Sequence, residues 1–166
     1  MSPKLIGMKP LTGGVLRLTF QGKGARAVSL NGLIARSEYL QPLNDASLFT
    51  RAKIIDGGAA VAWPDDIEIA AGLLWRIAEE QSGFNAADFD AWQQRMGLSN
   101  QEAADALGIA LSTLKSMKSG TTRISSAVAI ACRAMESEPA VLAAHFQPRR
   151  AGRPRKTPTS LERRQN

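Results

Sequence analysis

The chain has 166 residues, a hydrophobic fraction of 44% and a formal net charge of +6. This length accommodates one ordinary domain or two small ones, and the hydrophobic fraction supports a folded core, which excludes an intrinsically disordered protein. The lone cysteine, Cys132, cannot form an internal disulfide, and neither a signal peptide nor the roughly 20 apolar residues of a membrane span can be found. We therefore expect a cytoplasmic protein with no membrane partner.

Short runs of alternating apolar and polar residues occupy the first 64 positions, as β-strands require. Leu16, Leu18 and Phe20 fall on one side of a predicted strand over 15–20, and the hairpin loop that follows contains Gly22 and Gly24. The other predicted strands cover 5–9, 26–30, 51–55 and 60–63, with helical turns at 31–36, which Asn31 could cap, and 45–49, and a helix at 70–81. With a boundary at Ser82-Gly83, residues 1–83 are predicted to form an α+β module built on a small antiparallel sheet.

This module carries a series of short motifs in a fixed order. They are Lys9-Pro10-Leu11, Val28-Ser29-Leu30, Tyr39, Pro42-Leu43-Asn44-Asp45, Phe49 and Trp63-Pro64. Their order resembles a small bacterial module, domain-of-unknown-function family 2442. Modules of this kind occur fused to repressor-like DNA-binding domains, and some lie beside genes suspected to be toxins. The resemblance implies a module that binds a protein partner or a ligand, and it assigns no chemistry to it.

Residues 84–147 show the helical pattern of a second domain. A helix over 85–96, capped by Asn85 or Asp88, carries an apolar stripe of Phe89, Trp92 and Met96. Ser99 and Glu102 form the pattern of a capping box, which predicts that a helix starts at Asn100. Gly108 ends this helix and permits a tight turn, after which a second helix begins near Leu111. Further helices are predicted over 124–135 and 139–146, which makes five in an all-α domain.

The segment from Leu98 to Gly120 matches a known motif without gaps. The matching residues are Leu98, Ser99, Ala104, Gly108, Ile109, Thr113, Leu114 and Gly120. They resemble the phage-repressor-like (XRE-type) helix-turn-helix domain of bacterial regulators. Two residues depart from the pattern: Asn100 replaces the usual glutamine, and Ala110 replaces a serine or threonine cap, which costs about 1 kcal/mol of helix stability.

This resemblance implies that the second helix of the pair enters the major groove of double-stranded DNA. Its exposed positions would be Leu111, Ser112, Thr113, Lys115 and Ser116, while Asn100, Ser119, Thr121 and Arg123 would approach phosphates. Lys115 is the expected guanine contact, and one such helix covers only a half-site, so the resemblance also implies a homodimer. The alternative is a helix pair that no longer reads DNA and is retained for packing or for partner binding.

The positive charge is concentrated at the C-terminus. Residues 1–83 carry nine Lys or Arg and eight Asp or Glu, residues 84–138 five and six, and residues 139–166 seven and one. Residues 148–166 are therefore predicted to form a disordered basic tail. Around Arg153 and Arg155 the tail resembles an AT-hook, although Ala151 interrupts that pattern and a plain basic tail is the alternative. Both alternatives would raise the salt sensitivity of DNA binding.

Other chemistry has little support in the sequence. Asp65, Asp66 and Glu68 could suggest a metal site, but no histidine lies near them and a loop of solvated acids explains them. His145 and Cys132 lack the partners of a catalytic pair. Trp63 and Trp75 are expected in the core, with a small-ligand platform as the alternative.

These observations predict a protein with no catalytic residues, metal or cofactor. Two functions remain open. One is a DNA-binding transcriptional regulator associated with the nucleoid. The other is an antitoxin-like protein that neutralises the product of a neighbouring gene.

Overall fold

The computed structural model describes residues 3–148. It divides the chain into two compact units, Met1–Gly83 and Phe84–Asn166, called here the first and the second unit. Apart from Pro148, the predicted basic tail lies outside the described residues, and so do Arg153 and Arg155 of the predicted AT-hook.

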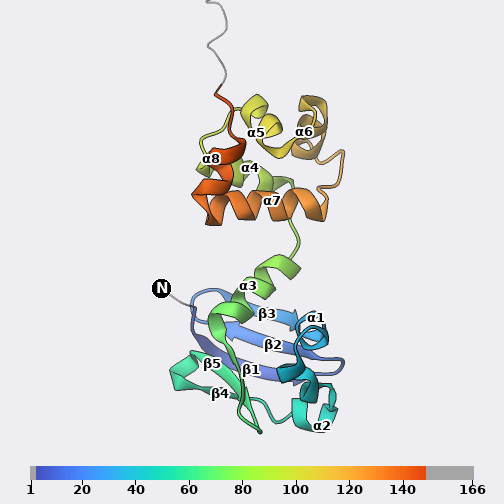
Figure 1. Cartoon of the computed structure of the whole chain (residues 1–166), viewed down its shortest axis with the longest axis vertical. Helices are drawn as coiled ribbons and strands as arrows, with labels where there is room; N and C mark the ends of the chain where they lie inside the picture. The colour runs from blue at the N-terminus through green and yellow to red at the C-terminus, as the bar shows by residue number, and fades with distance from the viewer. Residues whose placement is uncertain (1–2, 149–166) are drawn as a thin grey trace, which may run out of the picture. The chain divides into compact units, whose positions relative to one another are not determined.

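The first unit opens with a three-stranded antiparallel sheet in the order β1-β2-β3 (Figure 1). The strands are β1 (Leu5–Leu11), β2 (Val15–Phe20) and β3 (Gly24–Ser29). Leu16, Leu18 and Phe20 are fully or almost fully buried, which confirms the predicted alternation along β2. The opposite face of β2 therefore carries Val15, Arg17 and Thr19.

A second antiparallel sheet, in the order β4-β5-β6, follows in the same unit. Its strands are β4 (Lys53–Ile55), β5 (Ala60–Trp63) and β6 (Ile67–Ala70), with a short 3-10 turn, η2 (Asp56–Gly58), between the first two. Strand β6 was not predicted, and Glu68 lies in it rather than in a loop. The reason is the turn before it, where Asp65 and Asp66 both adopt positive φ, at 65° and 57°. Two such residues in succession close a tight hairpin, and aspartate tolerates this conformation.

Three short helices lie between the two sheets in the chain, and a fourth helix follows β6. They are α1 (Asn31–Ala35), η1 (Glu38–Asn44), α2 (Ala46–Phe49) and α3 (Ala71–Gln81), the last of which lies against β3 (Figure 1). The expectation that Asn31 caps α1 was wrong. Leu30 occupies the cap position, and the Asn31 side chain instead donates a hydrogen bond to the carbonyl of Gly13, at 2.9 Å, which ties α1 to the first hairpin.

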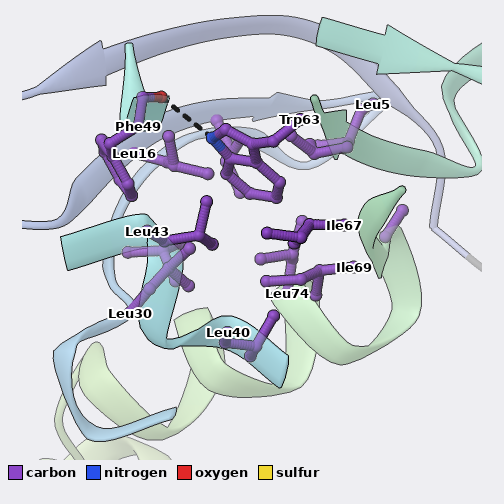
Figure 2. Close-up of a cluster of buried hydrophobic side chains, with 14 of the residues drawn as sticks. Leu5, Leu16, Leu30, Leu40, Leu43, Phe49, Trp63, Ile67, Ile69 and Leu74 are labelled. Carbon is purple, nitrogen blue, oxygen red and sulfur yellow. Dashed lines mark hydrogen bonds between the residues drawn. The ribbon is translucent and has the colours of Figure 1, made fainter. Parts of the chain in front are cut away.

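The core of the first unit gathers side chains from both sheets and from the helices between them. Figure 2 shows Trp63 facing Leu16, with Leu43, Ile67 and Leu74 completing the cluster. The buried Trp63 indole N–H donates to the carbonyl of Phe49, at 2.9 Å, so its polar atom is satisfied. Trp75 is half-buried and packs edge-on against Phe20, with ring centroids 4.9 Å apart. Both tryptophans therefore pack on the core, as predicted.

The described part of the second unit consists of five helices, the predicted number. They are α4 (Ala86–Arg95), α5 (Asn100–Leu107), α6 (Leu111–Lys118), α7 (Ser126–Ser137) and α8 (Pro139–His145). Phe89, Trp92 and Leu114 are completely buried at its centre, where α4 and α6 meet. Among residues 3–148, no helix has the length and apolar character needed to cross a lipid bilayer.

Candidate nucleic-acid interface

The first helix of the predicted pair, α5, begins with the predicted capping box. The Ser99 hydroxyl accepts the backbone N–H of Glu102, at 3.2 Å, and the Glu102 carboxylate accepts the backbone N–H of Ser99, at 2.8 Å. Two N–H groups that would otherwise lack a partner are satisfied by this exchange. The start of α5 is therefore fixed by four residues of local sequence.

Between α5 and α6 the chain turns at Gly108, which adopts the left-handed conformation with φ 65° and ψ 30°. The next residue, Ile109, donates its backbone N–H to the carbonyl of Ala104, at 3.0 Å, which closes the turn. Ala103 and Ala104 are both completely buried, so only methyl groups separate α5 from the helices that cross it. A larger side chain at either position would push α5 away from the helices that pack against it.

The second helix, α6, starts without a side-chain cap. Ala110 occupies the cap position and accepts no hydrogen bond through its side chain, as the departure from the family pattern predicted. The backbone N–H groups of Leu111, Ser112 and Thr113 in its first turn consequently depend on water or on an approaching anion for a partner.

Three polar residues of α6 share one face. Ser112, Lys115 and Ser116 are spaced by three and four residues and therefore neighbour one another on the helix surface. Ser112 and Lys115 are exposed and Ser116 is half-buried, whereas Leu114 and Met117 point into the core. The helix thus packs through its apolar side and presents a lysine and two hydroxyl groups on the other.

The remaining predicted residues occupy the flanks of this face. Asn100, Ser119, Thr121 and Arg123 are exposed, and Leu111 and Thr113 are half-buried. The Ser119 hydroxyl donates to the carbonyl of Ser116, at 3.0 Å, and lies 2.8 Å from the Thr121 hydroxyl. These hydroxyl groups hold the loop after α6 in place.

A hydrogen-bond network that the sequence analysis missed holds Asn100. The buried Gln93 amide donates to the Leu98 carbonyl and to the Asn100 side-chain oxygen, at 2.9 and 3.0 Å. The Lys118 ammonium group donates to the side-chain oxygens of Gln93 and Asn100, at 2.8 and 3.0 Å, and forms an ion pair with Asp90 at 3.0 Å. Because its oxygen accepts both of these hydrogen bonds, the NH2 group of Asn100 is the part of the side chain left to donate to another group.

One sequence signal could have revealed this network. Gln93 lies four residues after Phe89, one after Trp92 and three before Met96, so it belongs to the apolar stripe of α4. A polar residue on a stripe that packs into the core needs hydrogen-bond partners inside the protein.

Two further groups of the second unit are already committed to structural roles. Burial raises the pKa of the Cys132 thiol to about 12, so this side chain remains protonated near neutral pH and is a poor nucleophile. Arg95 forms a two-point ion pair with Glu136, with Nη2 and Oε2 3.0 Å apart. The hydrogen bonds from Arg95 lower the pKa of Glu136 below its usual value.

No protein-family model matches the chain, and no curated protein matches it significantly. The two family resemblances therefore rest on their motifs. Among solved structures, the chain is similar to the crystal structure of NE0471 from Nitrosomonas europaea, which is described as a "Putative DNA Binding Protein". The two share 25% sequence identity, the match covers 95% of this chain and 96% of NE0471, and the TM-score is 0.47.

Proposed function

We propose that the chain is a transcriptional regulator that binds duplex DNA sequence-specifically through α6. One observation carries this proposal: a helix pair hinged at Gly108 buries Leu114 and Met117 and leaves Ser112 and Lys115 exposed on the opposite side of α6. A helix presented in this way can enter the major groove, where base edges display distinct donor and acceptor patterns.

In this proposal, each polar group on the interface has a chemical role in DNA binding. The Lys115 ammonium group can donate to the O6 and N7 acceptors of guanine, and the Ser112 and Ser116 hydroxyl groups can donate to or accept from a base edge. The Asn100 amide and the Arg123 guanidinium group can donate to phosphate oxygens on either side. Leu111 can contact the methyl group of thymine.

The proposed active form is a homodimer. Helix α6 has eight residues and can reach only one half-site, so two copies on a palindrome supply the affinity that one copy lacks. In this proposal the regulator occludes a promoter, and the first unit binds a protein partner or ligand.

Selection of bound sequences from random duplex DNA with the full chain tests this function. We expect enrichment of a palindrome. Lys115→Ala should remove that enrichment, while Lys53→Ala, which changes an exposed lysine in β4 of the first unit, should keep it. A failure to enrich any sequence, or an unchanged result with Lys115→Ala, would contradict the proposal.

A further inference from the structure

The first unit is nearly neutral as a whole, but its positive and negative residues lie in different parts of its sequence. Residues 1–37 contain six Lys or Arg and no Asp or Glu, whereas residues 38–83 contain three and eight. The first group includes all of β1, β2 and β3, so the first sheet carries only positive charges. The second sheet and most of the helices carry the compensating acids.

The strand register brings two of these positive charges together on the outer face of the first sheet. Because Leu16 and Leu18 face the core, Arg17 between them points to the other side. Arg17 lies directly opposite Lys9 on β1 and Ala27 on β3. The neighbouring row on this face consists of Thr19 with Gly7 and Ala25 opposite it.

Lys9 and Arg17 are both exposed, and within residues 3–148 neither takes part in an ion pair. Like charges directly opposite each other on adjacent strands destabilise a sheet. The fold itself gains nothing from this pair, whereas a bound anion would relieve the repulsion. The surface is therefore suited to a negatively charged partner.

The side chains around the pair favour a nucleic-acid backbone over an acidic protein. Gly7, Ala25 and Ala27 are small, so a bulky polyanion can approach the sheet closely, and the rows of Arg17 and Thr19 contain no aromatic residue. Protein interfaces depend on buried aromatic anchors, which this face lacks. Residues 84–138, which include α6, carry a net charge of −1 and attract phosphates weakly by themselves.

We propose that the outer face of the β1-β2-β3 sheet, centred on Lys9 and Arg17, binds the phosphate backbone of duplex DNA. This inference rests on the proposed function and adds a second contact surface to it. The sheet supplies sequence-independent attraction, and the helix supplies selectivity.

A charge-matched pair of variants of the full chain tests this inference. Lys9→Gln/Arg17→Gln removes the two cations of the sheet face, and Arg51→Gln/Lys53→Gln removes two exposed cations from the acidic part of the same unit. Binding to a random-sequence duplex, measured by fluorescence anisotropy, is followed across a salt series. Both variants lower the net charge equally, so a difference between them reports the location of the charge.

We expect the sheet variant to flatten the slope of log affinity against log salt by about 2, and the control variant to leave the slope unchanged. For two lost phosphate contacts, the loss of affinity between about 50 and 200 mM salt becomes roughly tenfold smaller than for the unmodified chain. If circular dichroism shows that the double variant is unfolded, Arg17→Gln alone should flatten the slope by about 1.

The outcomes that would contradict this inference can be distinguished from those that would contradict the proposed function. Equal slopes for the sheet and control variants would overturn the inference, and retained palindrome selection would leave the proposed function standing. If the sheet variant lost binding to polyglutamate while its DNA slope stayed unchanged, an acidic protein would be the partner and the inference would be wrong. Absence of all duplex binding by the unmodified chain would remove both proposals.

Discussion

The polar face of α6 and the outer face of the first sheet differ in the kind of contact that they offer. The helix face presents one lysine and two serines beside a buried core, in a region whose charges nearly cancel. The sheet face presents two cations without an ion pair, Lys9 and Arg17, and the neighbouring row holds the Thr19 hydroxyl between Gly7 and Ala25. Contacts to bases give sequence discrimination, whereas contacts to phosphates give position and affinity. In the two proposals, these tasks therefore lie on different units of the chain.

The largest expected effect comes from removing the core support of the helix face. Leu114 is completely buried under α6, so Leu114→Ala should destabilise the second unit by about 2–5 kcal/mol. Sequence-specific binding should then disappear, while the salt-dependent attraction of the sheet face remains. Thermal unfolding followed by circular dichroism, together with binding to the selected palindrome, measures both effects.

Leu73→Ala provides a matched control for that loss. Leu73 lies on α3 with 42% of its surface exposed, so its truncation should change stability by only about 0.5 kcal/mol. Equal destabilisation by the two substitutions would show that burial of Leu114 does not hold α6 in place.

A smaller effect is expected at Gln93, which connects the core to the exposed Asn100, a proposed phosphate contact. Gln93→Ala leaves the Leu98 carbonyl and the side chains of Asn100 and Lys118 without this partner, which should cost about 1–3 kcal/mol. Without this partner the Asn100 amide should lose its orientation, and with it about 1 kcal/mol of hydrogen bonding to DNA. Affinity for random duplex DNA should therefore fall about fivefold. Gln94→Ala, at an exposed position of the same helix, is the control. Identical unfolding temperatures for the two variants would argue against the network.

Elements whose ends are set by neighbouring residues could be predicted from the sequence. The ends of α5 and the start of α6 could be predicted because local residues determine them: Ser99 with Glu102, Gly108, and the uncapped Ala110. The alternation of Leu16, Leu18 and Phe20 likewise fixes which face of β2 is buried, whatever the strand pairs with.

Features that depend on pairing between distant residues were missed. Strand β6 follows a turn that uses two aspartates at positive φ, and the sequence analysis interpreted these residues as a solvated loop. The Lys9 and Arg17 pair depends on the register of β1 against β2, so a charge count over the whole first unit hides it. The network at Asn100 requires α4, α5 and α6 to meet, which no local pattern specifies.

A substitution at the start of α6 is expected to stabilise the protein rather than destabilise it. Ala110→Ser supplies the missing side-chain acceptor at the start of the helix and should raise stability by about 1 kcal/mol. Because no charge changes, the salt slope for random DNA should stay the same. Chemical denaturation measures the first quantity and anisotropy the second. A steeper or flatter slope would mean that this helix end contributes to non-specific binding, which we propose for the sheet face.

The smallest expected effect distinguishes paired from unpaired cations. Arg95 is matched by Glu136, and their side chains are 53% and 37% exposed, so water screens the pair. Glu136→Gln should therefore cost less than about 1 kcal/mol at neutral pH. Since the folded state lowers the pKa of Glu136 below 4.5, the stabilisation is present above that value and is lost as the pH falls through the lowered pKa.

Denaturation across an acid pH series should accordingly show the unmodified chain and Glu136→Gln converging in stability as the pH falls. A difference that stays constant with pH would indicate that glutamine disturbs packing rather than charge. If Arg95, once released, also steepened the salt slope for random DNA, the second unit would hold a latent phosphate contact. The division between a cationic sheet and the nearly neutral residues 84–138 would then depend on the pairing of that arginine rather than on the number of their cations.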